Sequence, residues 1–250
     1  MSPKQYIPFH FHAEAHALSA KFTRPVAVPI EALAATSLPS IGGHAHARVE
    51  NFNVPRLVSF KSAHTHVSGS WQDEDTATTQ VTTVIEGVRI LDFVTADRIV
   101  ARLTAEHKRD QKEGHFLALG STFENLRIGG QELKVTLRHD LFLECETFDA
   151  LKKRVARDAK PEKMSVTDDG VALCSLVEKI EPGKLPGVEM EGHILRIRHF
   201  GEISLAEVFT VPGTRTLTML RLKLGSPDAG DGTVAEATIN GQPMPPGPGG

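Results

Sequence analysis

Apolar and polar residues alternate along most of the chain, which is the pattern of β-strands with one buried face. In Tyr6–Phe22, apolar or small side chains occupy one parity, while histidines and a glutamate occupy much of the other. The alternation recurs in many later segments, which are residues 44–54, 57–71, 77–91, 97–107, 125–139, 170–180, 193–211 and 215–225. The pattern predicts an all-β fold, either an antiparallel β-sandwich or a flattened barrel.

Two β-hairpins are predicted from their turn residues. Gly129-Gly130 and Asn240-Gly241 each interrupt an alternating segment, and both dipeptides favour the two-residue turns that join antiparallel strands. The expected hairpins cover residues 125–139 and 237–244.

One segment has helical spacing. Its apolar residues fall on one helix face, and they are Phe148, Leu151, Val155 and Ala159. Thr147 can cap the first turn, and Pro161 would end the helix. We therefore expect one short α-helix, at about residues 148–159, docked on a sheet.

The length and composition of the chain predict one domain followed by a short tail. The chain has 250 residues, of which 40% are hydrophobic and 24% charged, as in soluble globular proteins. All-β folds of this length often form one domain, so we expect a single domain over residues 1–242. The Pro- and Gly-rich residues 243–250 are expected to form a C-terminal tail, either loose or docked as an extended strip.

Charge and hydropathy narrow the expected partners and compartment. The net charge of −3 argues against a general nucleic-acid-binding protein, which would usually be basic. No apolar run reaches the length of a transmembrane helix, so no membrane span is expected. The N-terminus shows no secretory signal peptide, which favours the cytoplasm unless the protein leaves by a route that the sequence does not reveal.

The common catalytic motifs are missing. The chain contains no G-x-S-x-G, H-E-x-x-H, C-x-x-C, G-x-x-x-x-G-K or G-x-G-x-x-G motif, and no strand–helix alternation of nucleotide-binding folds. Hydride transfer, kinase-type chemistry and common hydrolase chemistry are therefore disfavoured. The sequence leans against an enzyme without deciding the question.

The remaining candidate functional residues are histidines. Seven of the 12 histidines precede residue 67, and six of these seven form three H-x-H pairs. On a strand, residues i and i+2 project from the same face about 7 Å apart, so both imidazoles can approach one metal ion. With a neighbouring glutamate and histidine, the candidate metal ligands are His10, His12, Glu14, His16, His44, His46, His64 and His66.

The three H-x-H pairs allow several interpretations. If their strands are adjacent, six imidazoles share one surface, and a divalent transition metal such as Zn, Cu, Ni or Fe is the expected cofactor. The alternative is a solvated strand face, in which histidine takes the place that Thr holds in residues 76–83. A catalytic metal site is a third alternative, although no downstream carboxylate and histidine clearly complete the pattern of H-x-H barrel enzymes. Protonated histidines would also repel one another in acid, which could gate assembly without a metal.

Three phrases of the sequence resemble one group of bacterial proteins. VIEGVRILDFVTADRIVARLTAE (residues 84–106), GSTFENLRIGGQEL (120–133) and RHFGEISLAEVF (198–209) resemble segments of the choice-of-anchor family of secreted, all-β surface proteins. The resemblance covers residues 40–140 and 190–225, and it implies a β-sandwich or barrel-like domain with a surface or structural role and no known catalysis. The chain departs from that family in showing no secretion signal, no anchor and H-x-H pairs where Thr or Ser is expected.

These features together predict a non-catalytic structural or binding protein that self-associates. Long strands with open edges are templates for strand addition, so the expected partner is a second copy or another protein's strand. One alternative is a transition-metal-binding protein that uses the three H-x-H pairs. The other is a metalloenzyme of the H-x-H barrel type acting on a small organic molecule, which needs an open coordination position and an apolar pocket beside the histidines.

Overall fold

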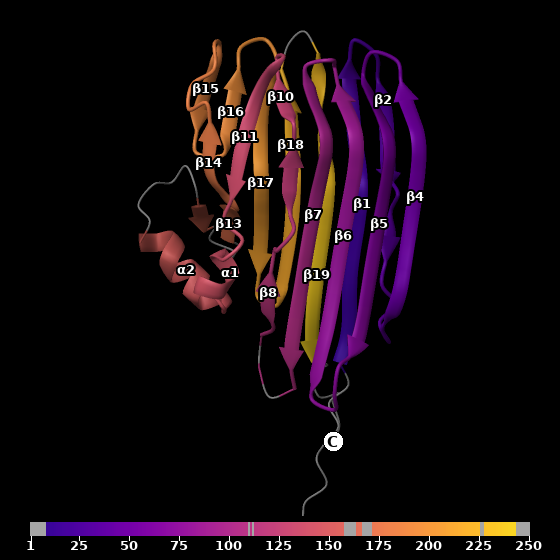
Figure 1. Ribbon diagram of the computed structural model, residues 1–250, viewed down its shortest axis with the longest axis vertical. Coiled ribbons are helices and arrows are strands. Elements are labelled where there is room, and N and C mark those ends of the chain that lie inside the picture. The colour runs from indigo at the N-terminus through magenta and orange to yellow at the C-terminus, as the bar shows by residue number, and fades with distance from the viewer. Residues whose placement is uncertain are drawn as a thin grey trace, which may run out of the picture.

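The structure is a computed structural model that describes residues 9–109, 111, 113–157, 164–166, 172–225 and 228–243. Two antiparallel sheets, called sheet A and sheet B below, stack face to face with their strands along the long axis of the molecule (Figure 1). The expected antiparallel β-sandwich is therefore the observed fold. Of the predicted tail, only residue 243 is described, and it lies in a strand.

Sheet A contains both ends of the described chain. Its ten strands follow the order β12-β13-β17-β18-β19-β1-β2, with β3 paired to β1, and with β16 joining β15 to β17. Their bounds are β1 (Phe9–Arg24), β2 (Val28–Leu33), β3 (Thr36–Ser37), β12 (Met164–Val166), β13 (Ala172–Ser175), β15 (Val188–Glu191), β16 (Ile194–Ile197), β17 (Gly201–Val211), β18 (Thr214–Leu224) and β19 (Ala229–Pro243).

Sheet B comes mostly from the first half of the chain. Its nine strands follow the order β14-β11-β10-β7-β6-β5-β4, with β8 and β9 paired to β7. Their bounds are β4 (Gly43–Val54), β5 (Val58–Trp71), β6 (Thr76–Ile90), β7 (Val94–Lys108), β8 (His115–Leu117), β9 (Thr122–Glu124), β10 (Leu126–Ile128), β11 (Gln131–Leu137) and β14 (Val177–Glu181). Strand β4 therefore forms one edge of sheet B.

One of the two predicted hairpins is confirmed, and the other is wrong. Strands β10 and β11 pair antiparallel across Gly129 and Gly130, whose φ angles of 57° and 79° suit a tight hairpin turn. Strand β19 runs through Asn240 and Gly241 without turning, and it pairs with β1 as far as Pro243. The ladders to β1 and β18 on both sides of β19 outweigh the local turn preference.

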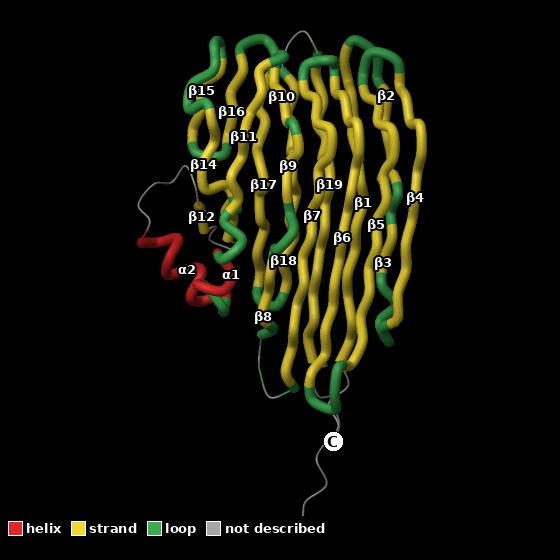
Figure 2. Tube along the Cα trace, in the orientation of Figure 1, coloured by secondary structure: helices red, strands yellow, loops and turns green. Residues whose placement is uncertain are grey.

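Two short helices lie beside one flank of the sandwich, as Figure 2 shows in red. The predicted helix is observed as α2 (Phe148–Arg157), and Thr147 caps it by accepting a hydrogen bond from the amide of Ala150 at 3.1 Å. Helix α1 (Leu141–Glu144) was not predicted, because its four residues are too few to show a helical period. No helix in the described part of the chain is long and apolar enough to cross a membrane.

Sheet A has a line across four strands at which the inward-facing parity changes. Successive residues of a strand normally point to opposite faces, but here two successive residues in each strand are both buried in the core. These dyads are Ala17-Leu18 in β1, Val234-Ala235 in β19, Met219-Leu220 in β18 and Leu205-Ala206 in β17. The register aligns the dyads across the sheet, since Leu18, Val234, Leu220 and Leu205 are paired in turn. Ala206 and Ala235 adopt left-handed φ angles of 47° and 52°, while the ladders on both sides keep their register.

Sheet B also changes parity, but there two successive residues of each long strand both point outward, between residues that point to the core. In β6 the buried Ile85 and Val88 flank Glu86 and Gly87, and Gly87 has a φ of 64°. The corresponding dyads of the neighbouring strands are Glu50-Asn51, Lys61-Ser62 and Asp97-Arg98. With these changes of parity, strands of up to 16 residues keep apolar side chains on the core on both sides of the change.

One hydroxyl group links the two sheets through the core. Thr83 of β6 is fully buried, and its Oγ1 donates a hydrogen bond of 2.9 Å to the backbone carbonyl of Glu236 in β19. Glu236 directly follows the left-handed Ala235, so this bond lies at the change of parity of sheet A. Thr83 therefore supplies a buried donor to a main-chain carbonyl of the opposite sheet.

Replacing Thr83 by the isosteric valine should lower the free energy of unfolding by about 1–2 kcal/mol, because the Glu236 carbonyl would lose its buried donor. Thr79, on the same strand, is the matched control, since its buried hydroxyl has no partner in the described structure. Thr79→Val should be neutral or slightly stabilising. Urea unfolding of both variants measures the difference, and equal losses of stability would contradict the inter-sheet bond.

Candidate functional site

The first H-x-H pair lies on the outer face of sheet A, in β1. His10 is exposed, His12 is half-exposed, and Nε2 of His12 lies 3.9 Å from a carboxylate oxygen of Glu14. His16 is less exposed, and its Nε2 forms a hydrogen bond of 2.9 Å with the hydroxyl of Thr233 in β19. The histidines of β1 thus belong to a polar outer face.

The other two H-x-H pairs lie together on the outer face of sheet B. His44 and His46 are on β4, His64 and His66 are on β5, and all four side chains are exposed. In the antiparallel register His46 is directly opposite His66, whereas His44 faces Ser68.

The structure does not bring the three pairs onto one surface. Strands β4 and β5 are neighbours, but β1 belongs to the opposite sheet, so a surface shared by six imidazoles does not form. Among the described residues, no group of three or more His, Cys, Asp or Glu side chains is placed to hold a metal ion. The eight predicted ligands are therefore divided between two outer faces, and only His46 and His66 are direct cross-strand neighbours.

The more highly organised polar site is a belt that crosses the outer face of sheet A at the parity change. Both residues of each apolar dyad point to the core. The polar residues directly before and after the dyad therefore become neighbours on the outer face of the sheet. We call this arrangement the polar belt, and its two rows are His16, Glu236, Thr218 and Glu207, and Ser19, Thr233, Arg221 and Ser204. Residues three apart form hydrogen bonds within it, such as Arg221 Nη2 to Thr218 Oγ1 at 3.3 Å.

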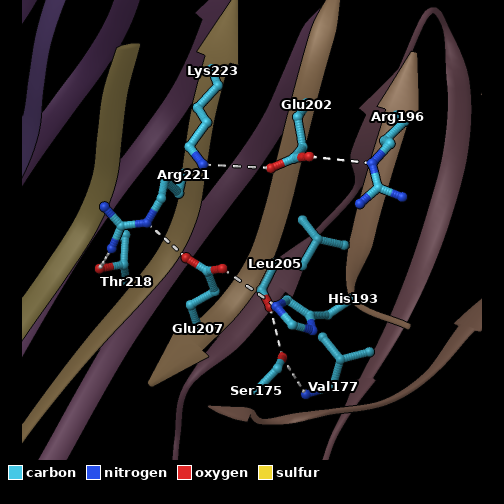
Figure 3. A network of polar contacts seen from close by, with 10 residues as sticks. All are labelled: Ser175, Val177, His193, Arg196, Glu202, Leu205, Glu207, Thr218, Arg221 and Lys223. Atoms are coloured by element: carbon cyan, nitrogen blue, oxygen red, sulfur yellow. Dashed lines mark hydrogen bonds and ion pairs between the residues drawn. The ribbon is translucent and has the colours of Figure 1, made fainter. Parts of the chain in front are cut away.

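Glu207 is the centre of the buried part of the belt (Figure 3). One carboxylate oxygen accepts a hydrogen bond of 2.7 Å from Nε of Arg221, and the other accepts one of 3.4 Å from Nε2 of His193. Thr218 continues the chain of contacts by donating to Glu236 at 2.9 Å. His193 directly precedes β16, so the belt joins four neighbouring strands of sheet A to the turn before a fifth, β16.

The surroundings of Glu207 keep its carboxylate ionised. Burial alone would raise the pKa of Glu207, but the hydrogen bonds from His193 and Arg221 and the charge of Arg221 outweigh it and lower the pKa to about 2. A general acid or base works best with a pKa near the ambient pH. Glu207 is therefore better suited to holding neighbouring strands together by its charge, as an electrostatic clamp, than to proton transfer.

A surface hollow lies near each end of the polar belt. One, of about 340 Å³, is lined by residues that include Glu14, His16, Ser37 and Glu236. The other, of about 630 Å³, is lined by residues that include Arg196, Arg198, Glu202 and Lys223. Glu202 lies 3.4 Å from Nε of Arg196 and 3.8 Å from Nζ of Lys223, so the charges of this second hollow largely pair with one another.

Arg215 is a second buried charge that the sequence did not single out. Its side chain is fully buried, and its Nη1 donates to the carbonyls of Val211 and Thr214 at 2.9 and 3.0 Å. The guanidinium also lies 4.4 Å from the ring centroid of Phe116. Burial lowers the pKa of Arg215 to about 10. These contacts fix the β17–β18 turn at one end of the core.

The family of the chain follows from a match that covers most of both sheets. A protein-family model matches residues 9–167 and 144–211. The chain belongs to this family, which is described as Domain of unknown function (DUF8256). No curated protein and no solved structure matches the chain. Membership of DUF8256 relates the chain to a family but gives it no activity, so its function has to be argued from the geometry of the structure.

The sequence holds one signal that could have revealed the polar belt. Four apolar dyads interrupt the alternation of β1, β17, β18 and β19, and each is flanked by polar residues three positions apart. Read singly, such a dyad is an irregular strand. Only the pairing register shows that all four dyads lie on one line.

Glu207→Gln should remove the acid-sensitive part of the stability that Glu207 supplies. The folded-state pKa is depressed from 4.5 to about 2, so this contribution is present above pH 4.5 and is lost as the pH falls towards 2. A shift of this size corresponds to about 3 kcal/mol at most. Urea unfolding between pH 7 and pH 2 should show a smaller acid-dependent loss in the variant than in the wild type.

The matched control is Glu202→Gln, which removes a more exposed carboxylate from the same strand. Its ion pairs are solvent-screened, so we expect a loss below about 1 kcal/mol at pH 7. If the two variants lose equal stability at pH 7 and share the wild-type pH profile, Glu207 is not the clamp described above.

Proposed function

We propose that this DUF8256 chain is a non-catalytic structural β-protein that self-associates through the open edge of β4. The observation that carries the proposal is the position of β4, which has 12 residues and pairs on one side only, with β5, within the described part of the chain. An unpaired strand edge presents a row of free amide and carbonyl groups that a second strand can complete. A second copy of the chain carries the same edge.

The protective features of edge strands are weaker on β4 than on two other edges. Strand β2 at an edge of sheet A has six residues and contains Pro29, and β14 at the far edge of sheet B has five residues and contains Lys179. Short length, proline and lysine all discourage edge-to-edge pairing. Strand β4 contains neither proline nor lysine, and its residues 44–50 lie between two left-handed residues, Gly43 with a φ of 108° and Asn51 with a φ of 53°. The stretch His44–Val49 thus lacks proline and lysine, and Arg48 is its one charged residue.

The inner face of β4 also supports association. Ala45, Ala47 and Val49 pack against the core but remain only partly buried, because β4 lies at the margin of the sandwich. A strand added to this edge would remove more of their apolar surface from water, in addition to forming main-chain hydrogen bonds. Both gains favour a continuous sheet across two copies.

The buried polar groups support a structural role. Glu207 is held ionised by His193 and Arg221, and Arg215 is held by main-chain carbonyls and an aromatic ring. Both sets of contacts tie strands together. The resemblance of residues 40–140 and 190–225 to choice-of-anchor surface proteins agrees with a structural or surface role.

The proposal predicts a monomer–dimer or higher equilibrium that depends on the β4 edge. Sedimentation velocity over a concentration series should show species heavier than the 27.2 kDa chain. Ala47→Lys places a charge on the inner side of the edge strand, a substitution that natural edges use to block pairing. It should raise the dissociation constant at least ~10-fold.

Ser68→Lys is the matched control, because it adds the same charge to β5, which has strands on both sides. Its self-association should equal that of the wild type. A wild-type protein that sediments as a monomer at every concentration would contradict the proposal, and so would equal dissociation by both variants. Circular dichroism of each variant checks that the sandwich is retained.

A further inference from the structure

Two exposed histidines lie side by side next to the proposed self-association edge. His46 on β4 and His66 on β5 are directly paired in the antiparallel register, and both project from the outer face of sheet B. Side chains at such positions have Cβ atoms about 5 Å apart, so two imidazoles can reach a single ion. Neutral imidazole is a good ligand for Zn²⁺, Cu²⁺ and Ni²⁺.

Neither imidazole is engaged by another side chain among the described residues. No hydrogen bond or ion pair to His46 or His66 is present among the described residues, whereas His16 and His193 are engaged in the polar belt. The nearest charges on β4 neutralise each other, because Arg48 forms an ion pair with Glu50. Across the next strands, His66 faces Thr82, and Thr82 faces Arg102. No carboxylate lies in this row of β4 to β7.

Within one chain the pair is an incomplete metal site. A stable zinc centre usually has four protein ligands, and no third His, Cys, Asp or Glu of the described residues joins this pair in a metal-holding arrangement. Coordination positions would therefore stay open to a donor from outside the chain. The open edge of β4 lies next to His46, so a second copy is the donor that the geometry favours.

Two-fold symmetry limits which residues of the two β4 edges can meet. Within β4, Gly43 and Asn51 have left-handed φ angles of 108° and 53°, and His46 lies in the extended stretch between them. Antiparallel pairing of two β4 edges about a two-fold axis centred on His46 keeps both outer faces on one side and places His46 opposite the partner's His46. The side chains of paired residues share a face, so His66, His46, the partner's His46 and the partner's His66 form one row.

We propose that His46 and His66 are half of a transition-metal site that a second copy completes across the β4 edges. This inference rests on the proposed function, since it requires the same edge. It assigns the H-x-H motifs different uses. The pairs on β4 and β5 supply His46 and His66 to the metal, while His10 and His12 on β1 face solvent on the opposite sheet.

The test is a titration of the full chain, prepared without a histidine tag, with Zn²⁺ alone. Isothermal calorimetry measures binding, and sedimentation velocity on the same samples measures mass. We expect Zn²⁺ to shift the protein from 27.2 kDa towards a dimer and EDTA to reverse the shift. The double variant His46→Ala/His66→Ala should lose at least ~10-fold in affinity and lose the metal-dependent shift. Both side chains are exposed, so this variant should fold normally.

The matched control is the double variant His10→Ala/His12→Ala, which removes an H-x-H pair from sheet A. It should bind Zn²⁺ and dimerise as the wild type does. Loss of the metal response in this control, or its survival in His46→Ala/His66→Ala, overturns the inference. Binding of Zn²⁺ without any change in mass overturns it as well, because the second copy would then supply no ligand.

The failure of this inference and the failure of the proposed function give different results. If the wild type assembles equally with Zn²⁺ and with EDTA, and Ala47→Lys abolishes the assembly, the edge is correct and the metal site is wrong. If no assembly occurs with or without Zn²⁺, the proposed function is wrong and the shared metal site fails with it.

Discussion

The aligned change of side-chain parity is the constraint on which the rest of the structure depends. Strands of up to 16 residues must bend with the twist of the sandwich, yet each must keep its apolar side chains on the core. Sheet A meets this requirement by turning two successive residues inward on four neighbouring strands, and sheet B by leaving two outside. Left-handed residues such as Ala206, Ala235 and Gly87 make the change sterically feasible. The Thr83–Glu236 bond then joins the two sheets next to the left-handed Ala235.

The polar belt is a consequence of that geometry. Inward apolar dyads bring the polar residues on either side of them together on the outer face, where a regular sheet would keep them apart. The result is a chain of charged and hydroxyl groups, centred on Glu207, that runs across the strand direction and ties strands that the backbone ladders already join. The contacts of Glu207 thus lie where sheet A changes parity.

Much of the fold could be predicted from local patterns, while the arrangement of the sites could not. Period-two alternation indicated the long strands, Thr147 marked the start of α2, and Gly129-Gly130 marked a true turn. Asn240-Gly241 misled because neighbouring ladders on both sides hold β19 straight. Whether the H-x-H pairs meet depends on strand order, which alternation does not encode, and the structure places β1 in the other sheet from β4 and β5. The partners of Glu207, His193 and Arg221, each lie 14 positions away along the chain, so no local sequence motif indicates them.

The central claim is that the edge of β4 is a surface on which a second copy adds. Hydrogen–deuterium exchange of the wild-type protein, recorded at low and high protein concentration, tests this claim at the level of single strands. We predict that amides of Gly43–Val49 exchange more slowly at high concentration, while those of β2 at the edge of sheet A are unchanged. Exchange of β4 that is independent of concentration, or slowing confined to a different edge, would contradict the claim.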